Sequence, residues 1–263
     1  MLQGPHFWDE RHTFDWYLNI YATSSVPVVQ SDPANVLIGD ASSNTLTFSG
    51  VGIRHQRNVP NGVTLAMVLA ALQPGLRLIA VLRNPVDRLY SSYFYYGHYA
   101  ARYGATAAGF HDFAVAQMEA YAACAPSKSR RDCAVEGYSR AEQLVKGMYS
   151  MFLPDYLAAF PREQLLVMRS ETYGDDVEAG LRAAMKHIGL EQPADDQWSP
   201  MVDAKRSNKR GSNGRSAGGD TGDMRPDTRQ LLNAFYQSYN VELATLLGDN
   251  SFMWHTQPPP SSQ

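Results

Sequence analysis

The apolar run Leu78–Leu82, followed directly by Arg83, Asn84 and Pro85, constrains the fold of this chain more than any other feature. Its length and composition are typical of a strand that is buried on both faces of a parallel sheet. Asn84 is a good helix cap, and Pro85 suits the first helical position because its φ is already helical and its missing N–H is not needed there. The sequence therefore predicts a strand, a tight turn and a helix.

The predicted helix has an apolar face and a polar face. Its N-terminus attracts anions, and the planar guanidinium of Arg83 matches the geometry of phosphate oxygens. Ser91 lies two turns into the helix, so its hydroxyl can reach the same pocket; the alternative is that Arg83 only forms a salt bridge. The apolar face contains Val86, Leu89, Tyr90, Tyr93 and Gly97, and the polar face contains Asn84, Asp87, Arg88 and Ser91.

Residues 83–91, RNPVDRLYS, resemble the 3′-phosphate-binding motif of carbohydrate sulfotransferases that use the donor PAPS, 3′-phosphoadenylyl sulfate. The Golgi enzymes that act on glycosaminoglycans are the most similar, particularly the N-acetylgalactosamine 4-sulfate 6-O-sulfotransferases. The resemblance implies that Arg83 and Ser91 hold the 3′-phosphate of PAPS and of its product PAP. Further similarity to the family lies in residues 4–8, 36–42, 147–171 and 226–254.

One part of the family pattern is missing from the sequence. The family's Gly-rich donor loop, with a Lys and hydroxyl residues for the 5′-phosphosulfate, is expected upstream of His6, and no G-x-x-x-x-G-K-[ST] motif occurs in the chain. Gln3 and Gly4 stand where the family has Lys and Glu. Either the sequence is an N-terminally incomplete version of a longer enzyme, which we favour, or it is a shortened and catalytically inactive relative.

The distribution of apolar residues predicts an α/β fold in which helices flank a parallel sheet. The resemblance implies a P-loop nucleotide-kinase-like sulfotransferase fold that lacks its first strand. We expect one sulfotransferase domain over residues 1–255, N-terminally incomplete, containing a flexible basic loop at 205–223 and followed by a disordered tail at 256–263. The predicted strands are Val36–Ile38, Leu78–Leu82 and Leu165–Met168, and the predicted helices are Val63–Leu72, Pro85–Arg102, Phe110–Ala123, Arg140–Phe160, Val177–Ile188 and Asp227–Leu247.

Length and composition agree with a single enzyme domain, and the charge indicates no particular partner. The chain has 263 residues, of which 44% are hydrophobic, and this is enough for a sizeable core. The net charge of −3 does not favour nucleic-acid binding. No spacing among the seven His residues suggests a metal site, so we expect no metal cofactor.

Several other residues are candidates for the donor and acceptor sites. His6 and Asp40 are candidate catalytic residues that could take the proton of the acceptor hydroxyl, although each could instead serve packing or local hydrogen bonds. Related enzymes place a basic, Gly-containing loop over the donor, which implies a cofactor-binding role for Lys209, Arg210 and Gly211. The alternative for this loop is a solvated linker.

Cys124 and Cys133 lie close together in a polar segment, where they form either a disulfide or two unpaired surface thiols. The lumenal sulfotransferases carry a disulfide in this region, and the resemblance therefore favours the bridge. It also implies a type II membrane protein of the Golgi lumen. Because no signal or anchor is visible in this sequence, any attachment to a membrane would depend on a missing N-terminal anchor.

These observations lead to one functional hypothesis and one alternative. The chain is expected to transfer a sulfuryl group from PAPS to a hydroxyl of a polysaccharide or glycosaminoglycan-like acceptor, without a metal. The alternative is a catalytically inactive sulfotransferase-like remnant that binds a nucleotide bisphosphate or a sulfated glycan.

Overall fold

The computed structural model of the chain is mostly helical and contains a small parallel sheet of two strands. It divides into two compact units. Unit 1 comprises Met1–Val81 and Phe152–Val202, and unit 2 comprises Leu82–Met151 and Asp203–Gln263. The structure describes residue 7 and residues 12–32, 36–47, 62–124, 126–202 and 223–254.

Unit 1 contains the sheet, and hydrogen bonds at the start of its strands fix how they pair. The Gln164 side chain donates to the carbonyl oxygens of Pro74 and Leu76, both at 2.8 Å, and Arg77 donates to the Glu163 carbonyl at 3.3 Å. The elements are α1 (Phe14–Ser24), α2 (Val26–Ser31), α3 (Leu65–Leu72), β1 (Leu78–Leu82, whose last residue belongs to unit 2), α9 (Leu153–Ala159), η2 (Arg162–Gln164), β2 (Leu165–Arg169), α10 (Ser170–Asp175), α11 (Val177–Ile188), η3 (Asp195–Gln197) and α12 (Trp198–Val202).

β1 and β2 confirm two of the three predicted strands, but the expectation that β1 is buried on both faces is wrong. The side chains of Ile79 and Val81 are 39% and 50% exposed. Since alternate residues of a strand point to the same face, one face of β1 is largely uncovered. Helices packed on a sheet cover the faces of its strands, and a sheet of two strands offers them less surface than the wider sheet that the sequence predicted.

The third predicted strand, Val36–Ile38, is also wrong, because these residues form no regular secondary structure. The chain turns directly after them. The Asp40 carboxylate accepts hydrogen bonds from the Ser42 N–H at 2.8 Å and from the Ser42 hydroxyl at 2.6 Å. Side-chain bonds of this kind favour a turn over a strand, and in the described residues only β1 and β2 pair.

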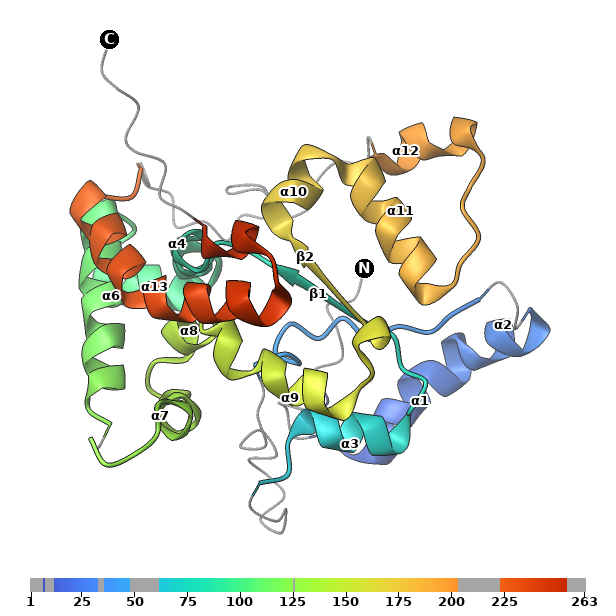
Figure 1. Cartoon of the computed structure of the whole chain (residues 1–263), viewed down its shortest axis with the longest axis horizontal. Helices are drawn as coiled ribbons and strands as arrows, with labels where there is room; N and C mark the ends of the chain where they lie inside the picture. Colours follow the sequence, from blue (N-terminus) through green and yellow to red (C-terminus); the bar gives the residue numbers. More distant parts are fainter. Residues whose placement is uncertain are drawn as a thin grey trace. The chain divides into compact units, whose positions relative to one another are not determined.

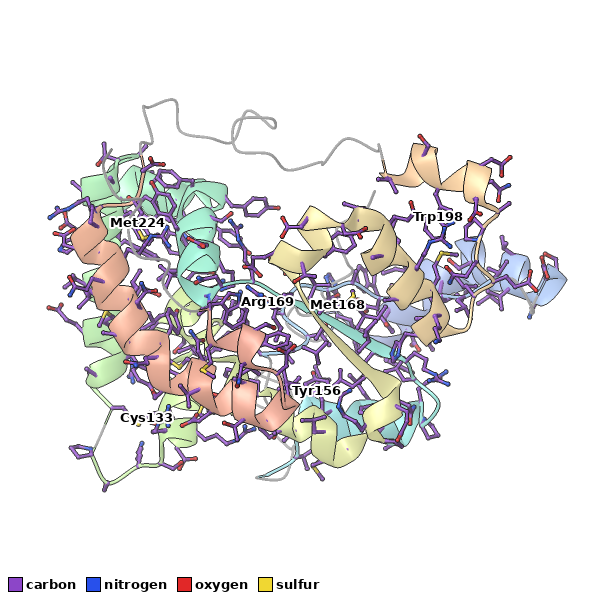
Figure 2. All side chains as sticks on the ribbon, turned by 45° about the horizontal axis from the view of Figure 1, so that its top comes forward. Cys133, Tyr156, Met168, Arg169, Trp198 and Met224 are labelled. Atoms are coloured by element: carbon purple, nitrogen blue, oxygen red, sulfur yellow. A yellow bond between two sulfur atoms is a disulfide. The ribbon has the colours of Figure 1, made fainter. Side chains whose placement is uncertain are left out.

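The C-terminal part of unit 1 is held together by an arginine that stacks on a buried tryptophan. The Trp198 side chain is 2% exposed, and the Arg182 guanidinium lies 4.2 Å from its ring centroid (Figure 2). Arg182 also pairs with Glu178 at 2.7 Å and with Asp195 at 3.3 Å. These contacts fasten α12 and η3 to α11, whose bounds match the predicted helix.

Unit 2 is built around the long helix α13, which contacts α4, α6, η1 and η4 (Figure 1). The side chains of Tyr93, Phe110, Phe113 and Tyr236 are at most 1% exposed and form much of the core. The elements are α4 (Pro85–Tyr95), α5 (Gly97–Tyr103), α6 (Ala107–Ala122), α7 (Arg130–Gly137), α8 (Glu142–Val145), η1 (Tyr149–Met151), α13 (Pro226–Leu247) and η4 (Asn250–Met253).

Two of the long predicted helices are interrupted. The helix expected at Pro85–Arg102 breaks at Tyr96, where ψ is 86°, and the chain restarts at Gly97, a residue with low helix propensity. The helix expected at Arg140–Phe160 is replaced by α8, η1 and α9. Pro154 lies in the first turn of α9. Since proline has no N–H for the previous turn, it starts a new helix there.

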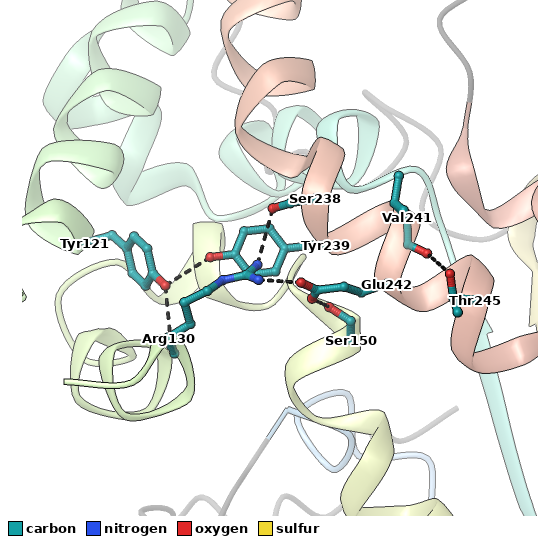
Figure 3. A network of polar contacts seen from close by, with 8 residues as sticks. All are labelled: Tyr121, Arg130, Ser150, Ser238, Tyr239, Val241, Glu242 and Thr245. Atoms are coloured by element: carbon teal, nitrogen blue, oxygen red, sulfur yellow. Dashed lines mark hydrogen bonds and ion pairs between the residues drawn. The ribbon is translucent and has the colours of Figure 1, made fainter.

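The disulfide predicted from the resemblance is confirmed: Cys124 and Cys133 are bonded. The segment between them carries Arg130, which lies at the start of α7 and contacts α13 (Figure 3). Its guanidinium forms an ion pair with Glu242 and lies 4.3 Å from the centroid of the Tyr239 ring. The bridge therefore restrains a segment that is also tied to the core helix.

One structural finding concerns the expected attachment to a membrane. Over the part of the chain that the structure describes, none of the helices is long and apolar enough to cross a bilayer.

The first prediction concerns the disulfide. Replacing both Cys124 and Cys133 by Ala should lower the free energy of unfolding by about 2–3 kcal/mol, because the bridge closes a short loop in the unfolded chain. Urea unfolding followed by circular dichroism measures this change. Dithiothreitol should destabilise the wild type by a similar amount and leave the double variant unchanged, and an equal response of both proteins would contradict the assignment.

The second prediction concerns alkaline pH. Burial, followed by the charge of Asp112, raises the pKa of Tyr93 to about 12 from its ordinary value of 10.0. Above pH 10 the tyrosine of the unfolded chain ionises first, so the free energy of unfolding should fall between pH 10 and pH 12. Urea unfolding of the wild type and of Tyr93→Phe tests this. The wild type should lose more stability than the variant over that interval, and parallel curves would contradict it.

Candidate functional site

The turn between β1 and α4 has the local structure that the sequence predicted. The Asn84 side chain accepts a hydrogen bond from the Val86 N–H at 3.0 Å and caps α4, and Pro85 is the first helical residue. The Asn84 carbonyl accepts from the Arg88 N–H at 2.8 Å. The chain thus passes from strand to helix through Arg83 and Asn84 alone, and the position of Arg83 is well defined.

Arg83 is exposed and Ser91 is half-buried. Within the described residues, neither the Arg83 guanidinium nor the Ser91 hydroxyl has a hydrogen bond or ion pair. The alternative that Arg83 only forms a salt bridge thus has no support in that part of the chain. Both groups remain available to an added ligand.

The other two charged residues of this polar face are already paired. Asp87 forms an ion pair with Arg229 of α13 at 2.9 Å. Arg88 donates to the Gln143 side chain at 3.3 Å and also to the Gln143 backbone oxygen. These contacts attach α4 to α13 and α8, so the two residues have a structural role.

A tyrosine from a distant part of the sequence binds the backbone beside this turn. The Tyr149 hydroxyl donates to the Arg83 carbonyl oxygen at 2.9 Å. Tyr149 lies in η1 and its side chain is 5% exposed. Sequence reasoning did not find this contact, because Arg83 and Tyr149 are far apart in the chain and share no local pattern.

Of the two candidate catalytic residues, the structure describes Asp40 but not His6. The Asp40 carboxylate accepts bonds from Ser42, and its other oxygen accepts from the Tyr17 hydroxyl at 2.9 Å. Burial, and secondly the charge of Asp40, raise the pKa of Tyr17 above its usual range, so Tyr17 stays a hydrogen-bond donor. His6 lies outside the described residues, and a catalytic role for either residue stays a prediction.

The structure does not describe the predicted basic loop. Lys209, Arg210 and Gly211 lie outside the described residues, as does the tail at 256–263. The expectation for a single domain over 1–255 also stays a prediction. Glu171 follows β2 and lies 3.8 Å from the Arg169 guanidinium, which makes it the partner of a basic residue (Figure 2 labels Arg169).

Comparison with known proteins shows that the chain is similar to carbohydrate sulfotransferases, although no protein-family model matches it. The similarity is to carbohydrate sulfotransferase 15, with 29% identity to the Homo sapiens protein and 26% to the Mus musculus protein. Each alignment covers 97% of this chain and 49% of the relative, so the chain spans about half the length of these relatives.

Two further proteins are also similar to the chain. The Homo sapiens bifunctional heparan sulfate N-deacetylase/N-sulfotransferase 2 is 27% identical over 68% of this chain and 20% of its own length. A solved sulfotransferase from Alicyclobacillus acidocaldarius superposes with a TM-score of 0.49 at 19% identity, covering 97% of this chain and 87% of that one.

The third prediction separates the two arginines of the site by stability. Arg88→Met should lower the free energy of unfolding by about 2–3 kcal/mol, because it leaves the oxygens of Gln143 without their charged donor. Arg83→Ala should change it by less than about 0.5 kcal/mol, since its side chain is exposed and has no partner among the described residues. Urea unfolding of both variants beside the wild type measures the difference. A larger loss for Arg83→Ala than for Arg88→Met would contradict the assigned roles.

Proposed function

We propose that the chain transfers a sulfuryl group from PAPS to a hydroxyl of a carbohydrate acceptor, and that Arg83 and Ser91 bind the donor's 3′-phosphate. One observation carries the proposal: residues 83–91, which resemble the family's 3′-phosphate motif, form a capped helix start at which Arg83 has no partner among the described residues. The similarity to carbohydrate sulfotransferase 15 supports the reaction class.

The physical chemistry of this turn suits a phosphate. Pro85 has no N–H, and the Val86 N–H is taken by Asn84, so side chains must provide most of the contacts at the first turn. A guanidinium can bind two phosphate oxygens at once, and a serine hydroxyl can donate to a third. The positive end of the α4 dipole adds attraction for a doubly charged anion.

In the proposed reaction, the acceptor hydroxyl oxygen attacks the sulfur of PAPS in line with the bond that breaks. The new sulfur–oxygen bond forms as the bond to the 5′-phosphate oxygen breaks, PAP leaves, and the hydroxyl proton passes to a base. Arg83 and Ser91 contribute by holding the far end of the donor, which aligns the reacting atoms. His6 and Asp40 are the proposed bases, and Lys209, Arg210 and Gly211 are proposed to cover the donor.

Acceptor and location are proposed on the resemblance. A glycosaminoglycan-like polysaccharide is the proposed acceptor, and the Golgi lumen is the proposed compartment. The bond between Cys124 and Cys133 agrees with a compartment in which disulfides persist.

A second candidate function is binding without turnover. In that case the chain would bind a nucleotide bisphosphate or a sulfated glycan. Incubation with PAPS and chondroitin sulfate separates the two candidates, because only the enzyme forms PAP in step with sulfate incorporation.

The fourth prediction tests the anion site directly. Arg83→Ala should weaken PAP binding by about 1.5–3 kcal/mol and Ser91→Ala by about 0.5–1.5 kcal/mol, in line with the loss of a charged and a neutral hydrogen bond. Isothermal titration calorimetry with PAP measures both. Arg102→Ala is a matched control, because Arg102 is also an exposed arginine of unit 2, and it should bind as the wild type does. Equal affinity of wild type and Arg83→Ala would exclude Arg83 from the site.

A further inference from the structure

We infer that Tyr149 is a positioning residue for the 3′-phosphate site, which it serves by fixing the peptide group from which the Arg83 side chain projects. This inference rests on the proposed function, because it assumes that Arg83 binds the donor. It adds a residue that touches neither the donor nor the acceptor and that acts through the backbone of Arg83.

The geometry begins with two anchored peptide groups in the turn that follows Arg83. The Tyr149 hydroxyl donates to the Arg83 carbonyl at 2.9 Å, and the Asn84 side chain caps the helix by accepting from Val86 at 3.0 Å. The first bond fixes the plane of the peptide that follows Arg83, and the second fixes the start of α4. Together they restrict rotation about the backbone of Arg83, whose side chain has no anchor of its own in the described residues.

Tyr149 is itself held firmly enough to act as an anchor. Its side chain is 5% exposed, and its ring centroid lies 6.1 Å from that of Trp254. Trp254 packs edge-on against Phe252 of η4, with centroids 5.5 Å apart. The tyrosine ring is thus fixed by aromatic side chains at the end of the described chain, and not by the turn that it stabilises.

The segment carrying Tyr149 also lies directly against α4. A Cβ atom added at Gly147 would stand 2.9 Å from the Cβ of Pro85 and 2.8 Å from the hydroxyl oxygen of Tyr236. Glycine is therefore required for this close approach. Gly147 and Tyr149 contact the same turn at neighbouring positions, the first by packing on Pro85 and the second by bonding the Arg83 carbonyl.

The Tyr149 bond preorganises the Arg83 backbone for binding. An exposed arginine loses side-chain and backbone freedom when it binds a phosphate, and a backbone that is already fixed reduces this cost. Removing the Tyr149 hydroxyl should therefore weaken the contact that Arg83 makes and leave the rest of the nucleotide unaffected. A tyrosine that only stabilised the fold would not distinguish between ligands with and without the 3′-phosphate.

The fifth prediction uses that distinction. Calorimetry on Tyr149→Phe should show PAP binding about 3- to 10-fold weaker than in the wild type, which corresponds to one neutral hydrogen bond. Adenosine 5′-phosphate, which lacks the 3′-phosphate, should bind both proteins equally. In the double variant Arg83→Ala/Tyr149→Phe, PAP affinity should equal that of Arg83→Ala alone, because Tyr149 acts only through Arg83.

A control variant and a second variant of the same turn complete the test. Tyr93→Phe also removes a tyrosine hydroxyl that donates to a backbone carbonyl in unit 2, that of Gly104, and it should leave PAP affinity unchanged. Gly147→Ala perturbs the same turn through Pro85, and it should also weaken PAP but not adenosine 5′-phosphate. It supplies the answer if Tyr149→Phe does not fold.

The outcomes separate this inference from the proposed function. If Arg83→Ala leaves PAP affinity unchanged, the proposed site itself fails. If Arg83→Ala weakens PAP but Tyr149→Phe does not, or if the two effects add in the double variant, the role of Tyr149 is overturned while the site stands. Equal weakening of both nucleotides by Tyr149→Phe also overturns it.

Discussion

The hydrogen bond from the Val86 N–H to the Asn84 side chain is the constraint on which the candidate site depends. It makes the chain begin α4 at Pro85, immediately after β1, and leaves Arg83 as the residue that joins strand to helix. A longer loop would give the Arg83 side chain many positions. With the helix start fixed and the Tyr149 hydroxyl bonded to the Arg83 carbonyl, the side chain projects from a backbone that is held on its C-terminal side.

The polar residues of this short segment differ in whether they have partners in the described part of the chain, and the proposed binding role rests on that difference. Asp87 and Arg88 are tied to α13 and to Gln143, where they join helices of unit 2. Arg83 and Ser91 are left without partners in the described part of the chain. A protein that used every polar group for stability would have none left for a ligand. The two uncommitted groups are therefore the ones on which a binding role is proposed.

Local sequence was sufficient where local chemistry decides the structure. The start of α4 followed from Asn84 and Pro85, and the bounds of α11 followed from its apolar period, with Asp176 capping one end and Gly189 in the left-handed conformation at the other. The helices α1 and α7 were missed although Thr13 and Ser129 cap them.

Prediction failed where distant residues decide the outcome, and where an apolar pattern outweighed a local signal. Val36–Ile38 has the composition of a strand but no neighbouring strand to pair with in the described residues, and the Asp40 turn follows it. The break between α8 and α9 was signalled by Pro154, which the apolar pattern obscured. The roles of Arg88 and Tyr149 depend on Gln143 and on the Arg83 carbonyl, and no local pattern links these residues.

A crystal structure of the chain with PAP tests the central claim most directly, because it shows which groups contact the 3′-phosphate. The account predicts phosphate oxygens within about 3 Å of the Arg83 guanidinium and of the Ser91 hydroxyl, with the Tyr149 bond to the Arg83 carbonyl intact. A 3′-phosphate bound elsewhere, with Arg83 still in solvent, would contradict it.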